Sequence, residues 1–164
     1  MLSTFPEKLP LLETNRLFLR KVKDHDLEYI IPIIFCEGVT ATDFDSAKML
    51  MKKIYSKMED KLVLHWGMAL KENDKVIGGV GFYRGFENNT GEIGYIIMPE
   101  YRKKGLVHEA CLALIDYALN TLLLSNISAY TSEDNEGSKA VLKKLGFTQV
   151  ESEKPDLIKY LLYV

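Results

Sequence analysis

The pattern of hydrophobic positions changes its period several times along the chain, which predicts a mixed α/β protein. Residues 62–70 and 76–83 alternate in the manner of strands, whereas residues 47–58 place apolar side chains three and four positions apart, as in a helix. The predicted strands are 16–22, 62–70, 76–83, 92–98, 127–132, 148–151 and 157–164. The predicted helices are a short one capped by Asp24 or Asp26 and ended or kinked by Pro32, one following Asp43, one over 106–124, and one capped by Asp134 or Asn135 and ending before Gly146.

The order of these elements indicates how the chain is connected. Strands 92–98 and 127–132 are separated by a long helix, so we expect them to be parallel neighbours joined by a right-handed crossover. The other strands are joined by turns or short helices. We therefore expect one α/β domain over residues 1–164, with a central mixed seven-stranded sheet flanked by about four helices.

Composition narrows the class of protein. The 164 residues include 21 Lys and Arg against 23 Asp and Glu, a net charge of −2, so a nucleic-acid surface is not expected. The two cysteines have no close Cys or His and are interpreted as buried thiols in a reducing compartment. The most apolar segment, 110–124, is interrupted by Asp116 and Asn120, and no targeting signal is recognised. These features favour a cytoplasmic protein with no membrane partner.

The segment 99–110 carries the most specific chemistry. Arg102, Lys103 and Lys104 form the only run of three cations in the chain, and Gly105 stands where the long helix begins. The first turn of a helix has backbone N–H groups without partners and a partial positive charge, which suits a diphosphate. The alternative is a solvated charged loop in which glycine eases a tight turn.

Other sequence elements accompany this loop. The loop follows Glu-Ile-Gly-Tyr-Ile-Ile-Met-Pro-Glu-Tyr (92–101) and precedes His-Glu-Ala (108–110), and Asp-Asn-Glu-Gly-Ser-Lys-Ala-Val-Leu-Lys-Lys-Leu-Gly-Phe follows at 134–147. Together with Leu-Glu-Thr-Asn-Arg-Leu-Phe-Leu-Arg at 12–20, this arrangement resembles the Gcn5-related N-acetyltransferase (GNAT) superfamily. The branch it resembles most is that of the ribosomal-protein-alanine N-acetyltransferases, the RimJ/RimL-like proteins.

The resemblance implies a binding site for acetyl-CoA as cosubstrate. Backbone amides of the loop would wrap the diphosphate, and the preceding strand would hydrogen-bond the pantetheine arm, while strands 4 and 5 of the sheet splay apart. Asn135 and Ser138, the Asn-x-x-Ser pattern, would contact the pantetheine or the departing thiol. Val107 stands where the family has Gly or Ala, and its β-branched side chain is expected to crowd the diphosphate. The residues implied to bind the cofactor are Ile96, Ile97, Met98, Arg102, Lys103, Lys104, Gly105, Leu106, Val107, Asn135 and Ser138.

The chemistry of amine acetylation suggests roles for particular residues. An α-amine, with a pKa near 8, costs about 1.4 kcal/mol to deprotonate at pH 7, whereas lysine costs more than about 4 kcal/mol. Glu92, a lone carboxylate in its strand, is the candidate general base, although it also fits a plain charge on a solvated face. Backbone N–H groups of Ile97 or Met98 are candidates for holding the oxyanion. Ser138 and Tyr130 are alternative donors of the proton to the thiolate, because the position where many relatives have tyrosine is Leu142.

These observations favour an acetyl-CoA-dependent N-acetyltransferase that acts on a primary amine, with a protein or peptide α-amine as the expected acceptor. The alternatives are a small-molecule amine acetyltransferase, acting on a polyamine, an aminoglycoside or an amino acid, and a non-catalytic acyl-CoA-binding module. No metal is expected, because the three histidines lack ligand spacing. A monomer or a homodimer is expected. Acidic residues in the expected acceptor loops would suit a cationic acceptor: Glu37, Asp43, Asp45, Glu153 and Asp156.

Overall fold

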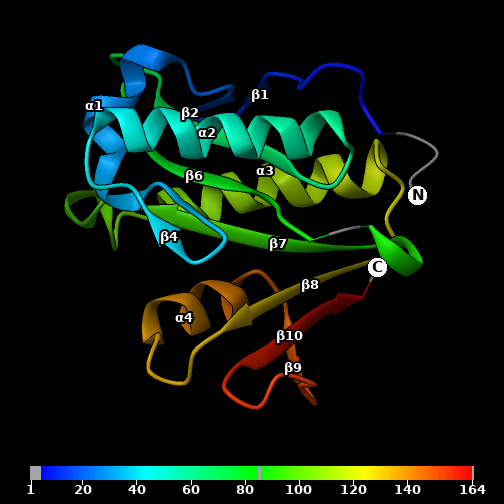
Figure 1. The fold of residues 1–164 in the computed structure, drawn as a ribbon. Coiled ribbons are helices and arrows are strands. Elements are labelled where there is room, and N and C mark those ends of the chain that lie inside the picture. Colours follow the sequence, from blue (N-terminus) through cyan, green and yellow to red (C-terminus); the bar gives the residue numbers. More distant parts are fainter. Residues whose placement is uncertain (1–4, 85, 164) are drawn as a thin grey trace.

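An eight-stranded sheet runs through the middle of the molecule (Figure 1). The computed structural model describes residues 5–84 and 86–163. The strand order is β1-β2-β5-β6-β7-β8-β10-β9, and neighbouring strands are antiparallel except for β7 and β8, which are parallel. The strands are β1 Leu12–Glu13, β2 Leu17–Arg20, β5 Leu64–Leu70, β6 Val76–Phe82, β7 Thr90–Ile97, β8 Asn126–Thr131, β9 Thr148–Val150 and β10 Ile158–Tyr163.

Helices cover both faces of this sheet. The short α1 (Leu27–Ile30) and the longer α2 (Phe44–Glu59) pack on one face, and α3 (Leu106–Asn120) packs on the other. The fourth helix, α4 (Glu136–Lys144), lies beside β8, and a separate hairpin of β3 (Phe35–Cys36) and β4 (Val39–Thr40) contacts α2. Short 3-10 turns are η1 Asp24–Asp26, η2 Ile31–Ile33, η3 Glu87–Asn89 and η4 Pro99–Tyr101.

The sheet separates two hydrophobic cores because alternate side chains of a strand point to opposite faces. Leu17, Trp66 and Phe82 are completely buried on the α3 face. Ala69 and Val76 are completely buried on the face covered by α1 and α2. β5 and β6 are buried along nearly their whole length, which explains why neither strand contains a charged residue at neutral pH. These central strands form the rigid floor on which the site is built.

The parallel strands β7 and β8 separate after a short paired stretch. They pair only at Thr90, Gly91 and Glu92 of β7, after which β7 continues to Ile97 without a partner in β8 among the described residues. In Figure 1 the two strands start together at one end and diverge toward the other, with α4 below the opening. The predicted splay between parallel strands of a mixed sheet is therefore confirmed.

The unpaired part of β7 directs backbone groups into this opening. Tyr83 N–H donates to Glu92 C=O at 3.0 Å, and Met98 N–H donates to Ile77 C=O at 2.9 Å. Antiparallel ladders alternate, so the even-numbered residues of β7 hydrogen-bond with β6. The N–H groups of Tyr95 and Ile97 consequently point toward the gap. Met98 N–H is already engaged, so of the two backbone groups considered for the oxyanion only that of Ile97 faces the opening.

Several details differ from the sequence-based expectation. The sheet has eight strands rather than seven, because Leu12–Glu13 adds a short edge strand and its pattern is too brief to recognise. The helix breaks next to Pro32 as expected, since α1 ends at Ile30, but a 3-10 turn, η2, then resumes with Pro32 in its first turn, where the fixed φ of proline suits a helix start. α3 ends at Asn120 and not at residue 124, and the β3–β4 hairpin was not predicted. Residues 1–4, 85 and 164, which the predicted domain and last strand include, lie outside the described residues.

The predicted helix caps and the cysteines can be checked. Asp26 stands at the N-cap position of α1, but its side chain makes no cap hydrogen bond to that helix and accepts instead from Lys23 N–H. Asp43 accepts a hydrogen bond from Ser46 N–H at the start of α2, and Asn135, one of the two expected caps, accepts from Ser138 N–H at the start of α4. Cys36 and Cys111 are free and buried, as expected. In the described part of the chain, none of the helices combines the length and apolar character needed to cross a bilayer.

Candidate active site

Two cavities lie on either side of the separated end of β7. The first, here called the α2-side cavity, has a volume of about 760 Å³ and lies between the sheet and the segment from α1 through α2. The second, here called the α3-side cavity, has a volume of about 800 Å³ and lies among β7, the start of α3 and the start of α4. Tyr95 and Ile96 line both cavities, so β7 forms their shared wall.

The α3-side cavity gathers the residues predicted to bind a cofactor. Its lining includes Ile96, Ile97, Arg102, Lys103, Lys104, Gly105, Leu106, Val107, Asn135 and Ser138. Met98 does not line it, and its side chain packs instead against the core on the α2 face. Residues from β7, the basic loop and α4, which are far apart in sequence, therefore meet around one opening.

The basic loop has the backbone geometry of an anion site. Gly105 has a φ of 76° and precedes the first residue of α3, and Lys103 has a φ of 59°. Few non-glycine residues adopt this left-handed conformation, which costs about 1 kcal/mol or more and often occurs at binding sites. The N–H groups of the first turn of α3, starting at Leu106, have no partner within the helix and face a cavity lined by three cations. A diphosphate fits this donor set.

An ion pair from the N-terminal segment supports the loop from behind. Arg16 Nε lies 2.7 Å from Glu109 Oε2, and Arg16 Nη1 donates to Lys104 C=O at 3.0 Å. Thr14 Oγ1 donates to Glu109 Oε1 at 2.5 Å, and Arg16 N–H donates to the same oxygen at 2.7 Å. Burial alone would raise the pKa of Glu109, but these hydrogen bonds and the Arg16 charge outweigh it and lower that pKa. Sequence reasoning missed this contact; the only signal was that the segments around Thr14 and Glu109 both belong to the quoted motifs.

Glu92 projects from β7 into the α2-side cavity. Its side chain is 19% exposed, and Arg84 Nε lies 3.2 Å from Oε1. Lys154 Nζ, from the loop between β9 and β10, lies 3.6 Å from Oε2. The carboxylate thus reaches the cavity with a cation beside each of its two oxygens.

A buried His–Tyr pair lies beside Glu92 on the floor of the same cavity. His65 Nδ1 and Tyr83 Oη are 2.6 Å apart, and both residues line the cavity. A Cβ at Gly79 would come within 2.8 Å of the His65 ring, and one at Gly94 within 2.8 Å of the Tyr83 ring. Glycine at these positions therefore lets both rings lie close to the sheet. Burial lowers the pKa of His65 to about 4, so the imidazole is neutral at pH 7.

Ser138 lies in the α3-side cavity and is hydrogen-bonded to a residue that sequence reasoning missed. Its Oγ is 2.8 Å from Tyr95 Oη, and either atom can donate. Tyr95 lines both cavities, and burial raises the pKa of its hydroxyl, an effect that the hydrogen bond with Ser138 partly opposes. The Tyr95–Ser138 pair therefore forms a hydrogen-bonded connection between the α3-side cavity and the α2-side cavity.

Comparison with known proteins agrees with this geometry. Residues 16–148 match the family described as the acetyltransferase (GNAT) domain. The chain belongs to the GNAT acetyltransferase family. An uncharacterised N-acetyltransferase, YoaA of Bacillus subtilis, is 29% identical over 162 residues, covering 94% of this chain and 89% of the relative.

Solved GNAT structures have the same fold. RimL, the ribosomal L7/L12 alpha-N-protein acetyltransferase in complex with coenzyme A, superimposes with a TM-score of 0.79 at 14% identity over 94% of this chain and 98% of the other. A spermidine N-acetyltransferase from Vibrio cholerae gives 0.71 at 19% identity over 90% and 94%. Structural neighbours therefore include a ribosomal-protein acetyltransferase, as the sequence resemblance suggested, and this chain is a GNAT N-acetyltransferase. GNAT enzymes use acetyl-CoA, and no group of three or more His, Cys, Asp or Glu in the described residues is arranged to hold a metal ion.

Tyr130 is outside the lining of both cavities, although Lys154, which lies over its ring, also contacts Glu92. Its hydroxyl hydrogen-bonds with Glu153, and Lys154 Nζ lies 3.4 Å from the centre of its ring. Tyr130 lines neither the α2-side nor the α3-side cavity. Burial and the neighbouring Glu153 carboxylate raise the pKa of its hydroxyl, which makes it a weaker proton donor.

Two departures from the GNAT pattern also have definite positions. Val107 lines the α3-side cavity while its side chain packs partly against the core on the α3 face. Leu142, at the position of the family tyrosine, is completely buried. The shared wall instead presents the hydroxyl of Tyr95, from a strand and not from α4.

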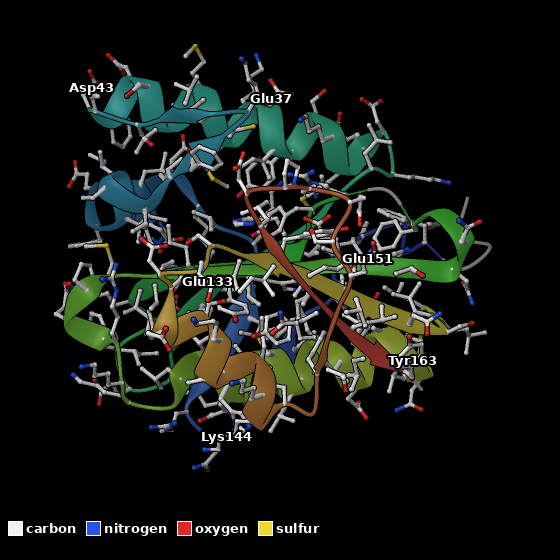
Figure 2. All side chains as sticks on the ribbon, turned by 90° about the horizontal axis from the view of Figure 1, so that it is seen from below. Glu37, Asp43, Glu133, Lys144, Glu151 and Tyr163 are labelled. Carbon is white, nitrogen blue, oxygen red and sulfur yellow. The ribbon has the colours of Figure 1, made fainter. Side chains whose placement is uncertain are left out.

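The acidic residues expected to attract a cationic acceptor are mostly engaged elsewhere. Asp43 caps α2, and Glu153 is bound by Tyr130 and Lys159. Glu37 lines the α2-side cavity, but Lys57 Nζ lies 2.5 Å from its carboxylate. Figure 2 shows Glu37 and Asp43 on the α2 side of the molecule, away from Lys144 on the side of α4. The cavity next to Glu92 is therefore not an acidic one.

Proposed function

We propose that this GNAT protein transfers the acetyl group of acetyl-CoA to the α-amine of a protein or peptide. The supporting observation is the pair of cavities that meet at Tyr95 and Ile96, with the basic loop lining one and Glu92 lining the other. Such an arrangement brings a thioester and an amine together from opposite sides of β7. The free, buried cysteines also support a cytoplasmic location.

In the proposed mechanism the amine attacks the thioester carbonyl directly. Glu92, acting through water, takes a proton from the attacking nitrogen, and Ile97 N–H stabilises the oxyanion. As the C–N bond forms and the C–S bond breaks, Ser138 gives its proton to the leaving thiolate and is reprotonated through Tyr95. The geometry favours Ser138 over Tyr130 for this role, because Ser138 lies in the α3-side cavity and Tyr130 lines neither.

An α-amine is the acceptor that this machinery suits best. Deprotonating an α-amine at pH 7 costs about 3 kcal/mol less than deprotonating lysine, so a modest general base is enough for an α-amine. A polyamine or aminoglycoside carries several ammonium groups, which the paired carboxylates of the α2-side cavity do not accommodate. A small apolar amine is a second candidate, and a non-catalytic acyl-CoA-binding module is the third.

Thiol release from acetyl-CoA, with a panel of peptides and small amines, tests the proposal. Peptides with a free α-amine are expected to release thiol faster than N-acetylated peptides that contain lysine. If acetyl-CoA at millimolar concentration does not raise the melting temperature, both the enzymatic proposal and the alternative of an acyl-CoA-binding module are wrong. If it raises the melting temperature and none of the amines releases thiol, the protein is a binding module and the enzymatic proposal is wrong.

Paired substitutions test the residue roles. Glu92→Gln is expected to lower kcat at least about 100-fold and to change the pH–rate profile. Ser138→Ala is expected to lower kcat about tenfold or more, whereas Tyr130→Phe serves as the matched control and is expected to leave kcat nearly unchanged. An unchanged rate and pH profile in Glu92→Gln would overturn the assignment of the base. If kcat falls more in Tyr130→Phe than in Ser138→Ala, Tyr130 and not Ser138 donates the proton to the thiolate.

A further inference from the structure

The α2-side cavity is an apolar chamber with a polar end. Its wall opposite the sheet is formed by Ile33 and Ile34 after α1 and by Met51 and Ile54 of α2, all of them buried side chains. Glu92 and the His65–Tyr83 pair lie on the side of the sheet, and the Glu37–Lys57 ion pair lies at the β3–β4 turn and α2. A molecule in the cavity would therefore meet the polar groups of the sheet on one side, and on the other side hydrocarbon together with one ion pair whose two charges already compensate each other.

The charges around this chamber are already balanced. Among the described residues that line it, the carboxylates are Glu37 and Glu92, and each lies within 4 Å of a cation. The His65 ring, neutral because its pKa is about 4, adds no positive charge at pH 7. An acceptor with one amine needs only the polar end, whereas a second ammonium would have to displace Lys57 or Arg84 from its partner.

We propose that the acceptor amine belongs to a residue with a large apolar side chain, such as Leu, Met or Phe, and that this side chain occupies the chamber between η2 and α2. The inference rests on the proposed function and adds the class of the first residue of the peptide. The cavity volume of about 760 Å³ lies within the range usual for ligand sites and exceeds what an alanine or serine side chain would fill. Burial of the larger side chain would anchor the amine beside Glu92.

A series of peptides that differ only at the first residue tests this inference. The measured quantity is kcat/KM for thiol release with Leu, Met, Phe, Ala, Ser, Asp or Lys in first place and with spermidine as a further amine. Leu exceeds Ala by three carbon atoms, so it is expected to react about 50-fold better. Asp, Lys and spermidine are expected to be poorer than Ala. Equal rates for Leu and Ala, or faster acetylation of spermidine, would overturn the inference while leaving amine acetylation intact.

Binding of reaction products gives a second readout that does not depend on turnover. N-acetyl-leucyl and N-acetyl-alanyl peptides carry the same charge and are measured by calorimetry in the presence of CoA. The leucyl product is expected to bind at least about tenfold more tightly. If it binds more tightly but no peptide is acetylated, the chamber is as inferred and the proposed enzymatic function fails. If the two products bind equally, the inference fails whatever the activity.

Matched substitutions in α2 connect the preference to the chamber. Ile54 lines the cavity, and Leu50, one turn earlier on the same helix, is also buried but does not line it. Ile54→Ala is expected to lower the Leu-to-Ala ratio of kcat/KM at least about fivefold, and Leu50→Ala is expected to leave it within about twofold. The ratio does not depend on the fraction of folded enzyme. Ile33→Ala repeats the test from another element in case Ile54→Ala fails to fold, and equal effects at Leu50 and at the lining positions would contradict the inference.

Discussion

The ion pair between Arg16 and Glu109 is expected to set the affinity for acetyl-CoA, although neither residue was predicted to bind it. Arg16 fastens the loop through Lys104 C=O and holds Glu109 in the first turn of α3. In Arg16→Ala the bonds from the side chain to Lys104 C=O and to Glu109 Oε2 are lost, whereas Thr14 Oγ1 and the backbone N–H of residue 16 still donate to Glu109 Oε1. Lys104 must then become ordered when the cosubstrate binds. Fixing the backbone of one residue costs about 1–2 kcal/mol, which corresponds to roughly tenfold weaker binding.

The effect on stability should be smaller than the number of contacts suggests. Hydrogen bonds to charged groups contribute about 1.5–3 kcal/mol each when they are buried. The Arg16 side chain is 46% exposed, so water and salt screen its interactions, and we expect Arg16→Ala to destabilise the fold by only about 1–2 kcal/mol. The pKa of Glu109 is lowered in the folded state, so this contribution is present at neutral pH and is lost as the pH falls through that lowered pKa.

Calorimetry with CoA and steady-state kinetics measure the expected change. The Kd and the KM for acetyl-CoA should rise about tenfold in Arg16→Ala, with kcat changed less than about twofold, because Arg16 lines neither cavity. Lys71→Ala is the matched control: it removes one positive charge and one ion pair, with Glu13, at a site without contact to the loop. If both variants raise Kd equally, only the overall charge matters, and the positioning role of Arg16 is refuted.

Three further outcomes are expected. Burial lowers the pKa of His65 from 6.5 to about 4, so the unfolded chain binds the proton first as the pH falls. The free energy of unfolding, measured with urea, should therefore be about 2–3 kcal/mol lower at pH 4.5 than at pH 7, and this difference should be smaller in His65→Gln. Asp26, which is 2% exposed, accepts two hydrogen bonds from Arg20, so Asp26→Ala should cost about 2–4 kcal/mol in urea unfolding, and a loss below 1 kcal/mol contradicts this. Val107→Ala should tighten CoA binding by up to about tenfold if the valine crowds the diphosphate, and an unchanged Kd shows that it does not.

The sequence predicted the parts of the site that depend on local pattern. The basic loop at the start of α3 and the Asn-x-x-Ser start of α4 could both be placed, because a helix start and its cap are specified by neighbouring residues. The parallel pairing of β7 and β8 followed from the long crossover between them. The short edge strand β1 was missed, since two residues carry no recognisable period.

Contacts between distant segments were beyond the reach of local pattern. Arg16 and Glu109 lie 93 positions apart, and nothing in either segment specifies the register that joins them. Tyr95 could not be distinguished from its apolar neighbours in β7, because its partner Ser138 belongs to another element. The rings of His65 and Tyr83 that lie over Gly79 and Gly94 became visible only in three dimensions.

The two cavities treat charge in opposite ways, and this difference suits the two substrates of the proposed reaction. Within the described residues, Arg102 and Lys103 form no ion pair, so their charges remain available to a diphosphate beside the α3-side cavity. The cations of the α2-side cavity, Lys57 and Arg84, are each held by a carboxylate. An amine must lose its own proton before it attacks, and an acidic chamber would stabilise the ammonium form and oppose that step. A chamber of balanced charge binds the apolar body of the acceptor without holding its nitrogen in the unreactive form. The net charge of −2 therefore does not show how the charges are distributed. Unpaired cations lie where the diphosphate would bind, and paired charges lie where the amine would react.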